Sequence, residues 1–264
     1  MIGALILRDI RRGYTGGAWL PIAFFLLVAT LVPFAIGPDA RLLSRVGPGA
    51  LWIAALTAAL LPIERLIEPD RADGMLDQLR LHGIADETIA ASKIAAHWLT
   101  FGPLLFVAAF PAAALLGIDG QSLARLLVSI GIGTPGLAAL AVAVAALTAG
   151  LPRSGSIAGL ILLPLAVPLL IFAAAFCANG SRQPITLEAA ISILLLAGAP
   201  FVAGAAIRAS RTWTIARRSR LEAGVRATPR VRPSLPTQLS RPTRRTSGAP
   251  ALRSRGRTSA PRKP

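Results

Sequence analysis

Lysine, cysteine and histidine are scarce in this sequence, and each scarcity excludes a class of function. Neither of the two lysines, Lys93 and Lys263, follows a glycine, whereas a phosphate-binding P-loop needs Gly-Lys followed by Ser or Thr. The chain therefore lacks this ATP site, and an ATP-driven process would need a second polypeptide. The single cysteine, Cys177, excludes an internal disulfide. The two histidines, His82 and His97, match no common zinc spacing, so we predict no metal site.

Charged residues are also scarce, at 15% of the chain against about 25% in a soluble globular protein. Residues 1–207 hold 12 Lys and Arg against 11 Asp and Glu, whereas residues 208–264 hold 16 against one. The chain therefore divides into a nearly neutral apolar body and a basic tail. The tail is proline-rich, so we predict disorder from about residue 221. The tail has no aromatic residue from about residue 221 onward, which argues against nucleic-acid binding.

Six apolar segments are long enough to cross a bilayer, which takes about 20 residues. They cover residues 18–37, 46–63, 94–118, 126–152, 154–181 and 189–207. Because backbone groups in lipid must be satisfied within their own segment, we predict six transmembrane helices. The fold class is then all-α integral membrane, with a permease-like domain over residues 18–207. These segments contain no acidic residue, which argues against an intramembrane enzyme.

The distribution of Lys and Arg predicts that both termini are cytoplasmic. In that topology the inner side carries eight Lys and Arg before the tail is counted, and the outer side carries four. Residues 1–16 place Ile2, Leu5, Ile6 and Ile10 opposite charged residues, which predicts an amphipathic helix in the membrane interface. A cleaved signal peptide is the alternative, but the 20-residue apolar core has no clear cleavage site.

The segment 64–93, between the second and third spans, holds seven of the twelve acidic residues. We expect it to project into water and to bind a soluble partner. Pro69-Asp70 predicts a helix start with Asp70 as N-cap, and Gly83 predicts the end of that helix. Asp86 then predicts the cap of a helix that continues into the third span.

Asp73 and Asp77 are four residues apart and would repel each other on an isolated helix. A partner that presents Arg or Lys would relieve that repulsion. An ordinary solvated helix face is the alternative interpretation. Glu64 and Arg65 are expected to pair with each other or with a partner at the membrane boundary.

Several short motifs follow one another in a characteristic order and spacing along the body of the chain. They are Gly37-Pro38, Leu42-Leu43-x-Arg45, Pro48-Gly49, Trp52, Glu64-Arg65, Asp70-x-x-Asp73-Gly74-x-Leu76, Lys93, His97-Trp98, Gly133-Thr134-Pro135 and Pro164-x-x-x-Pro168-Leu169-Leu170-Ile171-Phe172. This set resembles the CcmB family, the membrane subunit of the haem-exporter ABC transporter used in cytochrome c maturation. The resemblance covers residues 1 to about 207. The family usually has an aromatic residue where Ile67 stands and Ser where Met75 stands.

The resemblance implies an exporter permease without a catalytic site of its own, in the bacterial inner membrane. A separate ABC ATPase subunit would bind ATP and dock on the loop 64–93. The implied contacts are Glu64, Arg65, Asp70, Asp73, Gly74 and Leu76. A haem-handling membrane protein is implied as a second partner. Haem would be the cargo, or ATP hydrolysis would release a haem-loaded chaperone.

Trp52, His97 and Trp98 are the candidates for a haem or partner contact. His97 lies about one turn inside the third span, where a packed or hydrogen-bonded histidine is the alternative to a haem ligand. The two tryptophans near helix ends are typical of interface anchors. Two other functions stay open: a permease that exports a lipid or drug, and a membrane scaffold that transports nothing.

Overall fold

The computed structural model describes residues 2–17, 19–37 and 39–227, with side chains as far as residue 211. Every regular element in these residues is a helix. The helices are α1 (Ile2–Thr15), α2 (Trp19–Ile36), α3 (Ala40–Leu60), α4 (Glu64–Ala72), α5 (Met75–Leu81), α6 (Asp86–Leu115), α7 (Gly120–Thr148), α8 (Ser154–Asn179) and α9 (Arg182–Ala227). Since α9 reaches Ala227, the chain is still helical just beyond residue 221. The rest of the predicted disordered tail, 228–264, lies outside the described residues.

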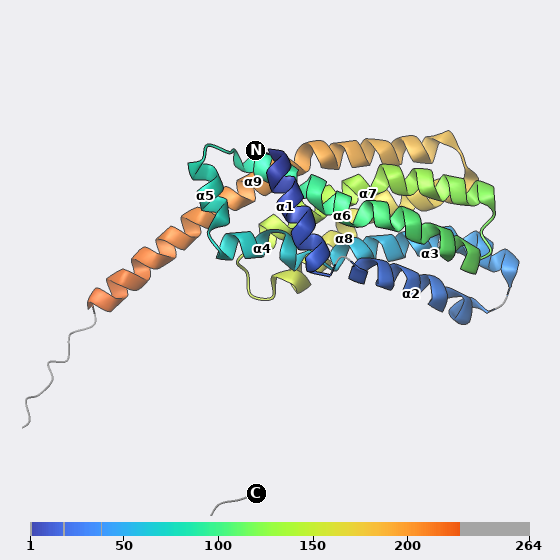
Figure 1. Ribbon diagram of the computed structural model, residues 1–264, viewed down its shortest axis with the longest axis horizontal. Coiled ribbons are helices and arrows are strands. Elements are labelled where there is room, and N and C mark those ends of the chain that lie inside the picture. Colours follow the sequence, from blue (N-terminus) through green and yellow to red (C-terminus); the bar gives the residue numbers. More distant parts are fainter. Residues whose placement is uncertain (1, 18, 38, 228–264) are drawn as a thin grey trace, which may run out of the picture. The chain divides into compact units, whose positions relative to one another are not determined.

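Six of the helices in the described part of the chain are long and apolar enough to cross a membrane. They are α2, α3 with α4, α6, α7, α8 and α9, and they run side by side in one bundle (Figure 1). Each of them overlaps one of the six predicted apolar segments, so the predicted all-α fold with six membrane-spanning helices is confirmed. The cytoplasmic placement of both termini stays a prediction.

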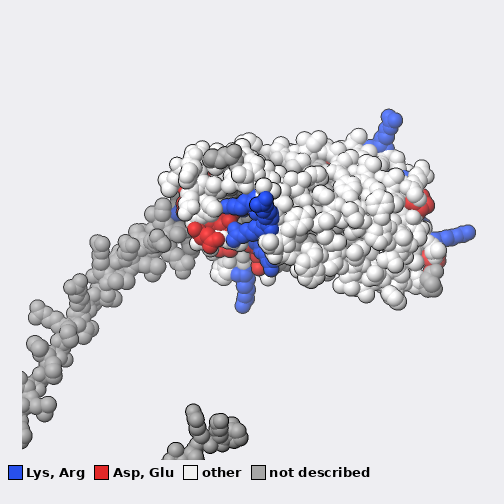
Figure 2. Space-filling model, in the orientation of Figure 1, with Lys and Arg blue, Asp and Glu red and all other residues white. Residues whose placement is uncertain are grey.

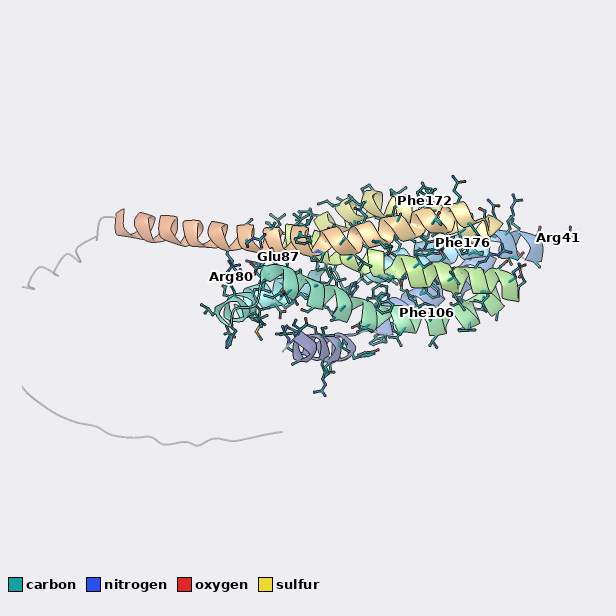
Figure 3. All side chains as sticks on the ribbon, turned by 90° about the horizontal axis from the view of Figure 1, so that it is seen from above. Arg41, Arg80, Glu87, Phe106, Phe172 and Phe176 are labelled. Carbon is teal, nitrogen blue, oxygen red and sulfur yellow. The ribbon has the colours of Figure 1, made fainter. Side chains whose placement is uncertain are left out.

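Charged side chains gather at the two ends of this bundle, and the surface between them is almost uncharged (Figure 2). α1, α4 and α5 lie at one end, which we call the loop end (Figure 1). Arg80 and Glu87 lie there, and Arg41 lies at the opposite end (Figure 3). This distribution is what a bilayer requires, because an ionised side chain in the hydrocarbon layer is costly.

Aspartates cap two of the helices that start at the opposite end, α3 and α7. Asp39 accepts hydrogen bonds from the backbone N–H groups of Arg41 and Leu42, at 2.9 and 3.1 Å, at the start of α3. Asp119 does the same at the start of α7. Hydrogen bonds from the backbone and hydroxyl of Ser122 lower the pKa of the Asp119 carboxyl, so the cap is a carboxylate at neutral pH.

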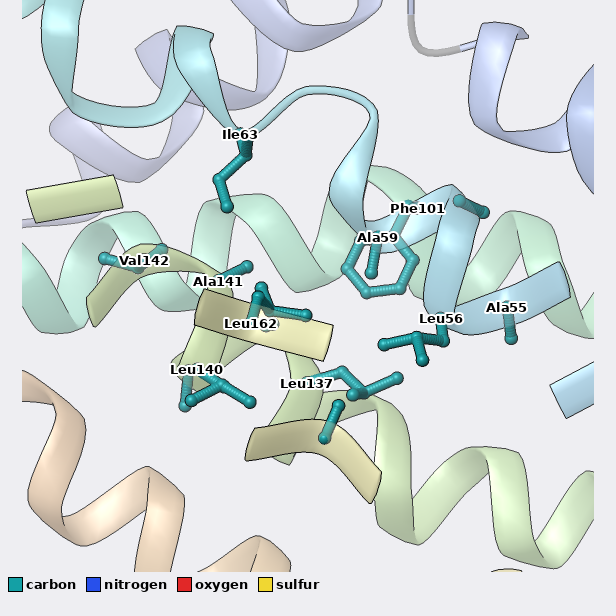
Figure 4. Close-up of a cluster of buried hydrophobic side chains, with 14 of the residues drawn as sticks. Ala55, Leu56, Ala59, Ile63, Phe101, Leu137, Leu140, Ala141, Val142 and Leu162 are labelled. Atoms are coloured by element: carbon teal, nitrogen blue, oxygen red, sulfur yellow. The ribbon is translucent and has the colours of Figure 1, made fainter. Parts of the chain in front are cut away.

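α7 lies at the centre of the bundle and packs against α3, α4, α6 and α8. Small and medium apolar side chains allow this close approach, and Figure 4 shows them interlocked between α3, α6, α7 and α8. The outer helices instead expose large apolar groups, for example Phe34 of α2 and Leu160 of α8. Exposed apolar groups on a spanning helix are suited to contact with lipid tails.

The segment 64–93 folds differently from the prediction. We expected one helix starting at Asp70, but α4 already starts at Glu64 and contains both Pro69 and Asp70. It begins directly after the turn that ends α3, so no free helix start is left at Asp70. Gly74 then separates α4 from α5 with φ of 70°, a left-handed conformation that disfavours residues with a Cβ.

The two other expected boundaries in this segment are close to those observed. Gly83 ends α5 with φ of 78°, and the N–H groups of Ile84 and Gly83 donate to Leu79 and Arg80 carbonyls. This is the Schellman pattern of a helix end. α6 starts at Asp86 and runs on into the third span, although its cap residue is Ala85.

Replacing Gly74 by alanine should lower the free energy of unfolding by about 1–2 kcal/mol, the cost of a left-handed residue with a Cβ. No atom lies within 4 Å of the added Cβ, so backbone strain is the whole cost. Asparagine tolerates this conformation better, so Gly74→Asn should lose less. Thermal unfolding of the purified variants measures both. Equal losses would show that backbone strain at Gly74 is not what decides stability there.

Candidate functional site

A buried charge cluster joins α1, α4 and α6 at the loop end. Asp70 of α4 is only 2% exposed. Its carboxylate accepts hydrogen bonds from Lys93 Nζ at 2.5 Å, from Arg12 at 2.7 Å and from Arg8 at 3.0 Å. Lys93 Nζ also lies 3.3 Å from the carboxylate of Asp9. We call these five residues the Asp70 cluster.

The cluster holds α1 against the bundle by its charged face. A buried carboxylate is tolerated only when cations and hydrogen bonds compensate its lost hydration. Burial lowers the pKa of the Arg8 guanidinium, but its hydrogen bonds and charge interactions with Asp9 and Asp70 raise that pKa above its ordinary value. Ile2 and Leu7 of α1 stay about half exposed. α1 thus offers apolar side chains outward while its charges dock on α4 and α6.

A second ionic cluster joins α5, α6 and α9. Arg211 of α9 lies 2.7 Å from the carboxylate of Asp77 and 2.9 Å from that of Asp86, and it donates to the Leu76 carbonyl at 2.8 Å. Arg80 also pairs with Asp86, which is fully buried. We call Asp77, Arg80, Asp86 and Arg211 the Arg211 cluster. It fixes the short helix α5 to two long helices.

α4 is tied to α7 and α8 as well. Glu68 accepts two hydrogen bonds from Arg71, at 2.5 and 3.0 Å, and one from the Gly150 N–H at 2.8 Å, between α7 and α8. A Cβ at Gly155 of α8 would overlap the carboxylate of Glu64. Only a glycine there lets α4 approach α8 so closely.

Arg65 lies beside a cavity of about 410 Å³ between α1, α2, α4 and α6. It donates a hydrogen bond to the Gly16 carbonyl. Charged members of the Asp70 cluster line one part of the cavity, and Leu20, Leu61 and Phe101 line another. Arg65 and Glu64 therefore contact different helices, and no bond between the two is among the contacts of the described residues.

The residues predicted to meet an ATPase are not all accessible. Asp73 is accessible, with a side chain 67% exposed and Arg12 at 3.6 Å. Asp70 and Leu76 are buried, so the expectation that the whole charged segment projects into water is wrong for them. The Asp70 carboxylate can be buried because cations on α1 and α6 compensate its charge. Sequence reasoning missed Leu81, a large apolar side chain that is 87% exposed at the end of α5.

Comparison with known proteins decides the family. The family model described as CcmB protein matches residues 1–210. The chain belongs to the CcmB family. It is 42% identical over 212 residues to "Heme exporter protein B" of Paracoccus denitrificans and of Rhodobacter capsulatus, covering 78% of this chain and 97% of each relative. The Escherichia coli protein of that name is 41% identical over 195 residues, covering 72% of this chain and 89% of the relative.

Trp52 does not anchor this CcmB-family chain at a membrane interface, so that interpretation is wrong for Trp52; for Trp98 it stays a prediction. Trp52 is 1% exposed and donates a hydrogen bond from Nε1 to Ser129 Oγ at 3.0 Å. Trp98 is half-buried and donates to Thr134 Oγ1, also at 3.0 Å. Both indoles thus bind hydroxyl groups of α7. They fix α3 and α6 to the central helix.

His97 is enclosed in the bundle next to the cavity. Its ring centroid lies 4.7 Å from that of Phe101, and the residue is 5% exposed. Its Nε2 atom is buried without a hydrogen-bond partner in the described structure. In this arrangement the ring fits a packed histidine, and the haem contact expected of His97 stays a prediction.

Sequence reasoning also missed Glu188. It lies in α9 and is fully buried, so the expectation that the spans hold no acidic residue is wrong. The apolar segment predicted from the sequence begins at residue 189, but α9 begins at Arg182. A helix that starts earlier carries Glu188 into the bundle.

Proposed function

We propose that this CcmB-family chain is the permease subunit of the ABC transporter that exports haem for cytochrome c maturation. Its spans would be moved by ATP hydrolysis on a separate ATPase subunit docked on residues 64–93. Membership of the family and relatives named as haem exporter proteins support the proposal. The chain has no P-loop of its own, which is consistent with an ATPase on a partner.

The observation that carries the coupling proposal is the pair of ionic clusters behind the loop. α5 presents Leu81 and the half-exposed Arg80 to a partner. Behind this surface, Arg211 connects α5 to α6 and α9. The Asp70 cluster connects α4 to α1 and α6. A partner that displaces α4 and α5 together would therefore pull on α1, α6 and α9.

Gly74 gives the loop a bending point between the two clusters. Its left-handed conformation separates α4 from α5, and open space surrounds it. In the proposed topology the loop end faces the cytoplasm, where ATP is available, in the bacterial inner membrane. A haem-handling membrane protein would be the second partner. The cargo is haem, or a haem-loaded chaperone released on the other side.

Complementation tests this function. We expect the full chain to restore c-type cytochromes in Escherichia coli cells that lack their own 41% identical relative. Asp73→Ala should weaken that restoration while the protein still reaches the membrane. Binding of an ATPase without restored cytochromes would instead indicate an exporter of another cargo. Restoration that survives an ATPase-dead partner would indicate a scaffold.

A further inference from the structure

Glu188 is an acidic side chain placed inside the membrane-spanning part of α9. It is fully buried and lies within the candidate span Arg182–Arg211. No ion pair of the described residues includes it. A carboxylate buried without a cation costs several kcal/mol, and an ionisable residue inside a membrane bundle is a candidate functional site. Its role is open because neither ionic cluster at the loop end involves it.

A chain of hydrogen bonds links Glu188 to two other helices. Ser129 Oγ of α7 lies 2.9 Å from both carboxyl oxygens of Glu188. The same Oγ accepts a hydrogen bond from Trp52 Nε1 of α3 at 3.0 Å. A Cβ at Gly133 of α7 would overlap both Trp52 and Glu188. A glycine on the central helix therefore makes room for this contact.

The hydrogen-bond donors and acceptors of Trp52, Ser129 and Glu188 favour one protonation state of Glu188. Ser129 has one hydroxyl hydrogen to donate and two lone pairs that accept. Trp52 occupies one lone pair. If Glu188 is protonated, its O–H donates to the other lone pair, and Ser129 donates to its carbonyl oxygen. An ionised Glu188 would have to share the one hydroxyl hydrogen of Ser129 between its two oxygens, which makes a weaker contact than two separate hydrogen bonds.

None of the charged or titratable groups named below places a positive charge on the Glu188 carboxyl that would replace that proton. Cys177 of α8 is within hydrogen-bond reach of Ser129 and Trp52. Arg125, one turn before Ser129 on α7, donates instead to the Cys177 carbonyl at 3.4 Å. Ser192 of α9 packs beside Gly136 and is neutral. The surroundings thus favour the neutral acid.

We propose that Glu188 is a proton-binding site, and that its neutral pair with Ser129 locks α9 onto α3 and α7. Loss of the proton breaks the pair and loosens the contact between α7 and α9. The proposal concerns the bundle itself and does not depend on the cargo or on the ATPase. In this role Glu188 is a positioning residue, because it acts on the packing of α7 and α3 through Ser129 and Trp52.

The test compares the wild-type chain with Glu188→Gln, whose amide reproduces the neutral pair at any pH. Thermal unfolding of the full purified proteins is followed from pH 6 to pH 9.5. The unfolded chain releases this proton above about pH 4.3, so the wild-type Tm should fall relative to that of the variant as pH rises from 6. At pH 9.5 the difference should be larger than at pH 6 by about 2–4 °C. Glu87→Gln, which removes a partly exposed carboxylate at the loop end, should keep the wild-type dependence on pH.

Cys177 provides a second readout, because it is the single cysteine of the chain and is buried beside the Glu188–Ser129 pair. At pH 9.5 N-ethylmaleimide should label Cys177 several-fold faster in the wild type than in Glu188→Gln. Breaking the Glu188–Ser129 pair loosens the contact between α7 and α9 and exposes the thiol. Parallel pH curves with equal labelling would overturn the proposal. So would a Glu188→Gln variant that fails to fold at pH 6, because the amide preserves the neutral pair.

Discussion

Asp70→Ala is expected to lower the free energy of unfolding by about 3–5 kcal/mol, the cost of breaking a buried ion pair from one side. Asp70 is 2% exposed and binds three cations. Its removal leaves the buried Lys93 with Asp9 alone, at 3.3 Å. α1 would also lose its two arginine contacts with α4, so the N-terminal helix should detach first. Thermal unfolding in detergent, with limited proteolysis of α1, measures both effects.

Asp73→Ala is the matched control for this prediction. It removes the same side chain three residues away, but its carboxylate is 67% exposed and lies 3.6 Å from Arg12. Exposed ion pairs contribute about 0–1 kcal/mol, so this variant should stay close to the wild type in stability. If both variants lose stability equally, or neither does, the Asp70 cluster does not hold the loop end together.

Arg211→Met should have the second largest effect. The substitution keeps most of the apolar stem. It removes the hydrogen bonds to Asp86 and the Leu76 carbonyl and the ion pair with Asp77. Hydrogen bonds to charged groups contribute about 1.5–3 kcal/mol, and the buried Asp86 would retain only Arg80. We expect a stability loss of that size. We also expect a fall in maturation activity greater than the lower amount of folded protein explains.

The adjacent turn of α9 supplies the control for Arg211. Arg208 pairs with Glu87, and both side chains are partly exposed. Arg208→Met should cost less than about 1 kcal/mol and leave α5 attached. Hydrogen exchange of α5 separates the two variants, because only Arg211→Met should make its amides exchange faster. Equal exchange in both would mean that Arg211 does not hold α5.

The six spans could be predicted from the sequence because length and apolar composition decide membrane insertion locally. The ends of those spans could not. Trp52 appeared to lie near a helix end because the apolar run starts at residue 46, but the Asp39 cap starts α3 at Ala40 and places Trp52 well inside the bundle. The same shift at α9 hid Glu188.

Ion pairs between residues far apart in the sequence could not be predicted either. The partners of Asp70 on α1, Arg12 and Arg8, are 58 and 62 residues away in sequence. A local pattern shows a polar segment at Asp70, but it does not show that other helices bring three cations to it. The motif Asp70-x-x-Asp73-Gly74-x-Leu76 therefore mixes buried and exposed positions. Which of its positions are buried depends on residues of other helices, and the motif itself does not contain those residues.

Purification of the chain from its native membranes in a mild detergent, with identification of the proteins that remain bound, tests the central claim most directly. The proposed function predicts a P-loop ATPase and a haem-containing membrane protein in the complex. It also predicts that charge reversal at exposed Asp73, with Leu81→Asp, releases the ATPase while the six-helix bundle stays folded. Recovery of the folded chain without any ATPase would contradict the role as a transporter subunit.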